Sequence, residues 1–147
     1  MKAILLYLML ASPLWAMSVP EEENPSDGKV QRIYNRIISG AHIKHAPIIS
    51  VEFGDVNAYY DGKRIVIYTG LLKFVRNEEE LALVIAHELA HVKWHTETRA
   101  DEYGALYLIA AGYNYCKAAQ LFKRFGDGDP PIHPSGADRY KAMRCSK

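Results

Sequence analysis

Apolar residues in the first half of the chain follow first a helical and then a strand periodicity. A repeat of three to four residues predicts a first helix from about Lys29 to Ser39. Strand-like patterns follow at 48–53, 57–60 and 64–68. Asp61-Gly62 is a strong turn signal between the last two of these segments. The pattern predicts a small, mostly antiparallel sheet of about three strands.

The second half of the chain is predicted to be helical. A short helical turn at 70–75 precedes a long apolar helix, which Asn77 caps with Glu80 completing a capping box. Three further helices are expected. The first is capped by Thr96 and runs through Ala111, the second is capped by Asn114 and runs from Tyr115 to Phe125, and the last is capped by Ser135 and ends near Cys145. A helix, a small sheet and a helical second half make the predicted class α+β.

Residues 87–91 read His-Glu-Leu-Ala-His, an HExxH pattern inside the apolar run Leu81–Trp94. Two histidines four residues apart lie on one face of a helix, where they can share a metal ion. Glu88 beside them could reach a water molecule at that metal. HExxH also occurs by chance, and helical histidines are often ordinary surface or core residues. The apolar surroundings favour a metal site, because buried polar groups need partners.

A catalytic zinc ion usually takes three protein ligands, and three residues after His91 are candidates for the third. His95 lies too far along a continuous helix, and His133 is distant in the sequence. Glu97 is preferred, with Asp101 one turn later on the same face to fix the tautomer of a ligand imidazole. Acidic residues are also common at ordinary helix starts. On spacing alone, both interpretations of Glu97 and Asp101 remain open.

Composition gives no sign of an unusual class of protein. The 147 residues suit one domain, with 49% hydrophobic and 24% charged residues. The formal charge of +1 does not suggest a nucleic-acid or anionic-membrane partner. Nothing in the sequence determines the oligomeric state.

The N-terminus predicts an export signal. Lys2 precedes the uncharged apolar segment Ala3–Ala11, which is too short to span a bilayer. Cleavage is expected after Ala16 or Ser18, so residues 1–18 are predicted to be a signal peptide and the protein periplasmic or secreted without a stable membrane anchor. Residues 19–28 are expected to form a flexible lead and residues 29–147 the folded domain.

The chain contains two cysteines, Cys116 and Cys145. In an oxidising compartment they could pair and tie the C-terminal tail to an earlier helix. The alternative is two unpaired thiols. The disulfide is favoured over unpaired thiols. Zinc ligation by these cysteines is not expected, because neither belongs to a CxxC motif.

Several segments occur in the order typical of one peptidase family. They are Val56-Asn57-Ala58-Tyr59, Ile65–Leu72, Glu79–Ala86 before the HExxH motif, Glu97–Asp101, Ala111–Asn114, and His133-Pro134 with Arg139. Together they resemble the HtpX and CaaX-prenyl-protease family of gluzincin zinc metallopeptidases. The resemblance implies a zincin-like minimal metallopeptidase core, with the small sheet packed on the HExxH helix.

The resemblance also implies a role for each matching residue. The ligands of one zinc ion would be His87, His91 and Glu97, with Glu88 as general base and Asp101 orienting a ligand histidine. Asn57, Ala58 and Tyr59 would lie on an edge strand that pairs with an extended peptide substrate. His133 and Arg139 would approach the cleft and stabilise the oxyanion. Without the resemblance, Asn57, His133 and Arg139 would read as ordinary turn, loop and surface residues.

The chain departs from this family in one respect. Members usually carry a long insertion between HExxH and ExxAD, whereas only five residues separate His91 from Glu97 here, with no glycine among them. The expected function is a zinc endopeptidase acting on extended or unfolded polypeptides, with a role in quality control of exported proteins. The alternative is a latent or non-catalytic, chaperone-like module that contains zinc and binds peptides, with His133 in the fourth zinc position.

Overall fold

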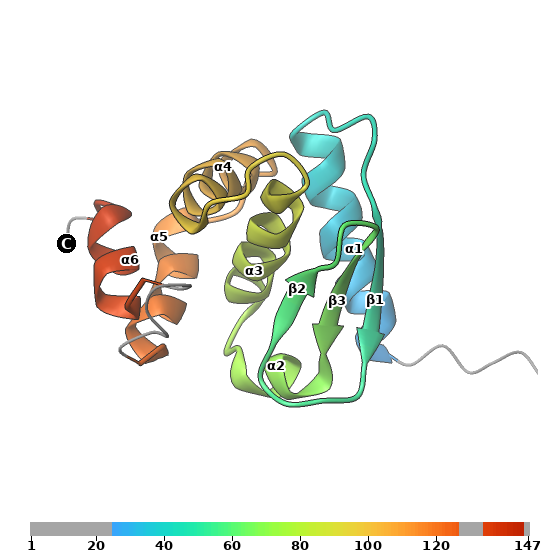
Figure 1. Cartoon of the computed structure of the whole chain (residues 1–147), viewed down its shortest axis with the longest axis horizontal. Coiled ribbons are helices and arrows are strands. Elements are labelled where there is room, and N and C mark those ends of the chain that lie inside the picture. The colour runs from blue at the N-terminus through green and yellow to red at the C-terminus, as the bar shows by residue number, and fades with distance from the viewer. Residues whose placement is uncertain (1–24, 127–133, 146–147) are drawn as a thin grey trace, which may run out of the picture.

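The computed structural model describes residues 25–126 and 134–145. The fold is α+β, and the helix α3 lies between a three-stranded sheet and the C-terminal helices (Figure 1). The helices are α1 (Pro25–Gly40), α2 (Thr69–Phe74), α3 (Glu78–His91), α4 (Glu97–Ala110), α5 (Tyr115–Ala118) and α6 (Gly136–Ala142), with a 3-10 helix η1 (Ala119–Arg124). The strands are β1 (Ile48–Glu52), β2 (Ala58–Tyr60) and β3 (Arg64–Tyr68).

The sheet is mixed rather than mostly antiparallel. β2 and β3 form the predicted antiparallel hairpin, but β3 also pairs with β1 in parallel, and the strand order is β1-β3-β2. The connection from β1 to β2 passes the end of β3, where the Gly70 N–H donates to the Gly54 carbonyl at 2.9 Å. A Cβ on Gly70 would lie 2.4 Å from the Asp55 carbonyl carbon, so this crossing requires glycine. The crossing places β2 at the edge of the sheet.

Helix α1 begins at Pro25, earlier than the predicted Lys29, so its first turn lies in the segment expected to be a flexible lead. Its predicted apolar face is buried against the sheet and α3. The largest buried residues of this core include Ile33 and Ile37 from α1, Ile65 and Ile67 from β3, Leu81 and Ile85 from α3, and Phe122 from η1. Burial of these side chains orients α3 and the motif it carries.

Helix α3 begins after Asn77 as predicted, but only one of the two hydrogen bonds of the predicted capping box is present. The Asn77 side chain accepts the Glu80 N–H at 3.0 Å. The Glu80 side chain does not return to Asn77, because it accepts the Arg76 N–H at 2.7 Å and pairs with Arg124 of η1. Glu80 is fully buried, so this ion pair joins α3 to the C-terminal half inside the core.

The C-terminal helices are shorter than predicted. The expected helix Tyr115–Phe125 is a single turn of α-helix, α5, continued by the 3-10 helix η1. The predicted disulfide is confirmed, since Cys116 and Cys145 are bonded across a sequence separation of 29. Predicted caps are also confirmed at Thr96, Asn114 and Ser135, whose side chains accept the backbone N–H three residues later.

Among residues 25–126 and 134–145, no helix is both long and apolar enough to cross a membrane. The predicted signal peptide, 1–18, and most of the predicted lead lie outside the described residues. His133 lies outside them as well.

Candidate metal centre and cleft

Helix α3 carries the three motif residues at its C-terminal end. The side chains of His87 and Glu88 are buried, and His91 is partly buried in the last turn. The helix is apolar on nearly all sides, and ten of its fourteen residues are buried, so packing fixes its rotation. The histidines therefore point to one side of α3 without any contribution from a metal.

The short link from His91 to Glu97 turns without a strained residue. Within the described residues, the non-glycine positions with positive φ are His42 and Arg144, neither of them in this link. The Trp94 carbonyl lies 3.0 Å from His91 Nδ1, and the Trp94 ring stacks on Tyr103 of α4 at 4.3 Å. The link therefore holds His91 and the start of α4 together, although it contains no glycine.

Helix α4 presents the next two acidic residues toward α3. Glu97, Asp101 and Gly104 follow at helical spacing, so they share one face. A Cβ on Gly104 would lie 3.1 Å from the Cα of His87, closer than ordinary packing contacts. The missing side chain lets the two helices approach at the level of His87, which brings both carboxylates to the histidines.

The donor atoms of His87, His91 and Glu97 converge on one point. The two Nε2 atoms are 3.1 Å apart, and each lies 3.3 Å from a Glu97 carboxylate oxygen. A tetrahedral metal ion with bonds of about 2.0–2.1 Å separates neighbouring donors by about 3.3–3.4 Å. The three side chains have the spacing and the chemistry to hold a metal ion.

The other imidazole nitrogens are committed to hydrogen bonds. His87 Nδ1 lies 2.9 Å from Asp101 Oδ1, and His91 Nδ1 faces the Trp94 carbonyl. With protons on both Nδ1 atoms, the two Nε2 atoms present lone pairs to each other, an arrangement that a cation stabilises. Asp101 thus lies where it could fix the tautomer of the His87 imidazole, the role predicted for it.

Charge at His87 follows from the same contacts. Burial alone would lower the pKa of His87, but hydrogen bonds to Asp101 and Glu97 and the charge of Glu88 raise it to about 9. Burial would raise the pKa of Asp101, but hydrogen bonds from His87 and Arg139 hold it below its usual 3.8. A proton on His87 therefore competes with a metal ion for this site.

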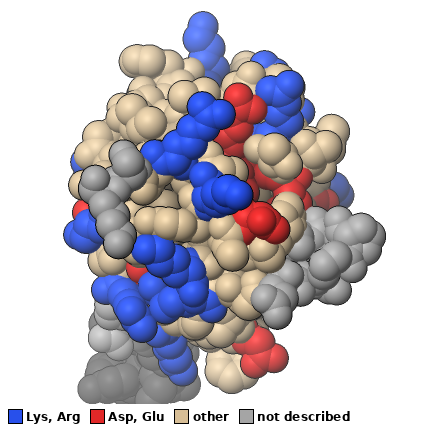
Figure 2. Space-filling view, turned by 90° about the vertical axis from the view of Figure 1, so that its left-hand side faces the viewer, with Lys and Arg blue, Asp and Glu red and all other residues tan. Residues whose placement is uncertain are grey.

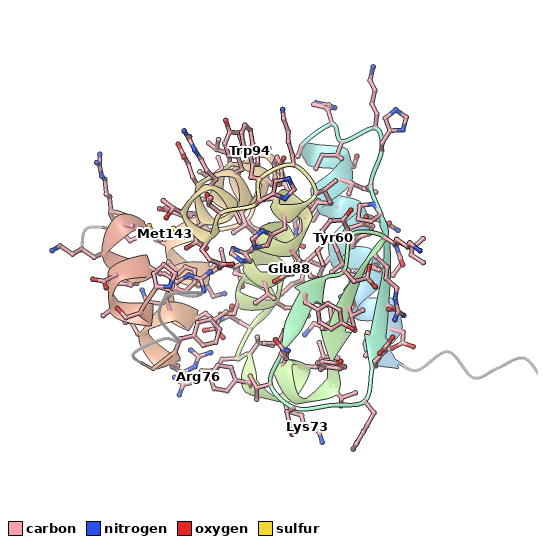
Figure 3. All side chains as sticks on the ribbon, in the orientation of Figure 1. Tyr60, Lys73, Arg76, Glu88, Trp94 and Met143 are labelled. Atoms are coloured by element: carbon pink, nitrogen blue, oxygen red, sulfur yellow. A yellow bond between two sulfur atoms is a disulfide. The ribbon has the colours of Figure 1, made fainter. Side chains whose placement is uncertain are left out.

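The Glu88 side chain lies on the side of α3 that faces the end of β2, where Tyr60 is found (Figure 3). Its carboxylate accepts a hydrogen bond from the Tyr60 backbone N–H. Burial is the main cause that raises the pKa of Glu88 above its usual 4.5, while the charges of His87 and His91 oppose that shift. A buried carboxylate with a raised pKa next to a metal site suits proton transfer.

A mostly apolar cavity of about 400 Å³ opens beside His87 and Glu88. Asn57 and Ala58, at the start of β2, line it, whereas Tyr59 packs its ring against Tyr68 at 5.9 Å. Leu83 and Val84 of α3 line it too, as do Phe122 of η1 and Phe125 just after it. The predicted strand residues thus border the cavity beside the motif, except that the Tyr59 side chain faces elsewhere.

Arg139 also borders this cavity, but its guanidinium is engaged with Asp101. Nε donates to Asp101 Oδ2 at 2.8 Å and Nη2 to Oδ1 at 2.5 Å. Two residues are expected to stabilise an oxyanion. His133 lies outside the described residues, and Arg139 contacts the site mainly through Asp101, the hydrogen-bond partner of His87.

Residues 24–95 match the model of peptidase family M48. A CAAX prenyl protease 1 homolog of Arabidopsis thaliana is 27% identical over 136 residues, and one of Oryza sativa subsp. japonica is 28% identical over 138 residues. A beta-barrel assembly-enhancing protease of Yersinia pestis is 32% identical over 76 residues.

The chain belongs to peptidase family M48. The alignments cover 86% of this M48 chain for each plant protein and 50% for the Yersinia protein. They cover only 32%, 16% and 32% of the Arabidopsis, Yersinia and Oryza proteins, so the chain spans about a third of their length or less. The family match includes His87, Glu88 and His91 and ends before Glu97 and Asp101.

Sequence reasoning missed several features of the M48 site. Gly104 follows Asp101 by three residues and Glu97 by seven, so helical spacing would have placed it on the same face. The Trp94 carbonyl and the Tyr60 N–H leave no sequence signal, because they are backbone groups. The pairing of Arg139 with Asp101 joins residues 38 apart, and local patterns do not reveal such a contact.

Proposed function

We propose that the chain is a zinc-dependent endopeptidase with a zincin-like core that cleaves extended or unfolded polypeptides. The observation that carries the proposal is the convergence of the His87, His91 and Glu97 donors beside buried Glu88. Two imidazoles and one carboxylate are a donor set of catalytic zinc sites, which keep a position open for water or substrate. Family membership supports a metalloprotease in general terms.

The residues around the site suit peptide hydrolysis. A zinc ion, when bound, would polarise the scissile carbonyl and lower the pKa of a water molecule. Glu88 would take a proton from the attacking water and deliver it to the leaving amine. Asp101 and the Trp94 carbonyl would keep the histidine Nε2 atoms available by holding the Nδ1 protons.

β2 offers an edge for an extended substrate. The Tyr68 N–H donates to the Asn57 carbonyl and the Asp61 N–H to the Arg64 carbonyl, so the backbone groups of Ala58 and Tyr60 point away from β3. A peptide could add as a further strand along these groups, where it would take over the Ala58 N–H that donates to the Asn57 side chain and the Tyr60 N–H that donates to Glu88. Its course would pass Glu88 and the apolar cavity, which could take one large apolar side chain.

Export of the protein is part of the proposal. The predicted signal peptide, 1–18, supports a periplasmic or secreted location, and the Cys116–Cys145 disulfide suits an oxidising compartment. Cleavage of unfolded chains there would serve the quality control of exported proteins. One matched relative is a protease whose name refers to assembly of β-barrels.

One experiment tests the function directly. Residues 19–147, the predicted mature chain, are purified, their zinc content is measured, and casein cleavage is compared with that of Glu88→Gln. The variant keeps the size of the side chain but removes the base, so cleavage should fall by about 10²–10⁴-fold while zinc stays bound. Equal cleavage by both proteins would rule out Glu88 as the base. Bound zinc and peptide without any cleavage would favour the latent, peptide-binding alternative.

A second variant examines the third ligand. Glu97→Ala should weaken zinc binding strongly, because two imidazoles alone leave the donor set incomplete. Unchanged zinc affinity in Glu97→Ala would remove Glu97 from the ligand set.

A further inference from the structure

Arg139 is held at one edge and at one face of its guanidinium group. It makes two parallel hydrogen bonds to the Asp101 carboxylate, and its guanidinium carbon lies 4.3 Å from the centre of the Phe122 ring. Its side chain is only 12% exposed, and that of Asp101 only 14%. Bidentate pairs of this kind fix the plane of the carboxylate as well as its position.

The same carboxylate oxygen serves Arg139 and His87. Asp101 Oδ1 lies 2.5 Å from Arg139 Nη2 and 2.9 Å from His87 Nδ1, and Nη2 is also 3.4 Å from that nitrogen. Rotation of the Asp101 carboxylate would weaken both contacts. Arg139 therefore determines which way Asp101 faces, and Asp101 determines how the His87 ring is turned.

The helix that carries Arg139 is short and packs on η1. α6 has seven residues, of which Gly136 is buried, and Met143 is buried just after it. Figure 2 shows the face that contains α6, where Lys and Arg side chains stand out. At its C-terminal end, Cys145 is bonded to Cys116 of α5, and the Tyr115 hydroxyl donates to the Met143 carbonyl. The disulfide and this hydrogen bond thus attach the C-terminal end of α6 to α5.

We propose that Arg139 is a positioning residue for His87, acting through Asp101, and that the Cys116–Cys145 disulfide holds α6 in place for this contact. The inference rests on the proposed metal function. It differs from the oxyanion role that the family resemblance implies, because a positioning residue changes metal affinity, whereas an oxyanion donor changes the rate of the loaded enzyme.

Zinc affinity of Arg139→Gln is the first test, measured by competition with a chromophoric chelator. The control is Lys141→Gln, which removes a cation from an exposed position on the same helix. We expect Arg139→Gln to bind zinc about tenfold more weakly, the lower end of the range for such partners, and Lys141→Gln to bind like wild type. At saturating zinc, kcat of Arg139→Gln should stay within a few-fold of wild type.

A different pattern would overturn the inference. Wild-type zinc affinity in Arg139→Gln with a kcat lower by about 10²–10³ would show an oxyanion role instead. Nitrogen NMR of the metal-free protein adds a readout that is independent of activity. The His87 Nδ1 signal should move in Arg139→Gln and not in Lys141→Gln, and an unmoved signal would contradict positioning.

The role of the disulfide is tested by substituting both cysteines, Cys116→Ser and Cys145→Ser, in wild type and in Arg139→Gln. Loss of the disulfide should weaken zinc binding in the wild-type background and have little further effect in Arg139→Gln, since both changes release the same contact. Equal effects in both backgrounds, or none in either, would overturn the link. Affinities are compared below the melting temperature of each metal-free variant, so that unfolding does not contribute.

Failure of the inference and failure of the proposed function give different results. If wild type does not bind zinc, the proposed function fails. If wild type binds zinc and Arg139→Gln binds it equally well, only the positioning role fails.

Discussion

Helices α3 and α4 both have fourteen residues, but the protein holds them in different ways. Ten residues of α3 are buried, whereas only Ala100, Gly104, Ala105 and Leu108 are buried in α4. α3 is packed on several sides, against α1, the sheet, α4 and α5. α4 packs closely on α3 through one buried face, and the short helices after it are also attached by ion pairs to α3 and by a disulfide. The motif histidines are therefore held by the burial of α3, whereas Glu97 and Asp101 stay in place only while α4 remains packed on α3.

The strongest expected effect concerns the ion pair that joins the two regions inside the core. Arg124 binds Glu80, whose side chain is only 2% exposed. Arg124→Met should lower the free energy of unfolding by about 3–5 kcal/mol, because it leaves a buried carboxylate unpaired. Urea denaturation of the metal-free protein measures this loss.

A matched control uses the neighbouring ion pair between the same regions. Lys117 and Glu79 are 2.9 Å apart, but the Lys117 side chain is 52% exposed. Lys117→Met should therefore cost at most about 1 kcal/mol. Similar losses in both variants would show that burial does not distinguish these two links.

The disulfide should have the next largest effect. Reduction of Cys116–Cys145 removes a crosslink between residues separated by 29 positions and should cost about 2–4 kcal/mol. Thermal unfolding with and without reductant, in the presence of a metal chelator, measures the change. A variant with serine at both positions should melt at the same temperature in both buffers. A wild-type melting temperature that does not change with reductant would mean that the disulfide does not contribute to the stability of the C-terminal helices.

Acid should weaken the link at Glu80. Burial would raise the pKa of this carboxyl, but hydrogen bonds from Arg124 and the Arg76 N–H hold the pKa below its usual 4.5. Because the folded-state pKa is depressed, the stabilisation is fully present above pH 4.5 and is lost as the pH falls through the folded value. The difference in unfolding free energy between wild type and Glu80→Gln should therefore shrink below pH 4.5. A constant difference down to pH 2.5 would contradict this assignment.

Helix caps give the smallest expected effects and compare the two helices directly. Asn77→Ala at α3 should cost about 1 kcal/mol, since its side chain accepts the Glu80 N–H at 3.0 Å. Thr96→Ala at α4 should cost less, because its bond to the Arg99 N–H is 3.4 Å long and exposed. Melting temperatures of both variants test the order. The reverse order would mean that the start of α4 is held more firmly than its burial suggests.

Local sequence signals were sufficient to predict much of the fold and to single out His87, His91 and Glu97, which the structure brings together. The apolar run around the HExxH motif, the caps at Asn77 and Thr96, and the Asp61-Gly62 hairpin all act over a few residues, which is why they could be recognised. The roles predicted for individual site residues remain predictions. The geometry of His87, His91, Glu97 and Asp101 agrees with them.

Features that depend on distant contacts could not be predicted in the same way. The parallel pairing of β1 with β3 results from a loop that crosses beneath Gly70, and alternation of apolar residues is the same for either strand order. η1 is a 3-10 helix in which Phe122 is buried and Arg124 pairs with Glu80, and local helix propensity reveals neither contact. The contact between Arg139 and Asp101 appears only once α6 is folded back onto α4.

The close approach of Gly104 to His87 has a consequence for experiments that divide the chain. Cutting it within residues 92–96, which are exposed except for Trp94, would leave two histidines on one fragment and Glu97 on the other, so neither fragment would hold the complete donor set. Metal uptake by a mixture of the two fragments would then report their reassembly. A bulkier residue at position 104 would prevent the interlocking of the fragments without altering any donor atom, which makes this glycine a natural control for fragment complementation.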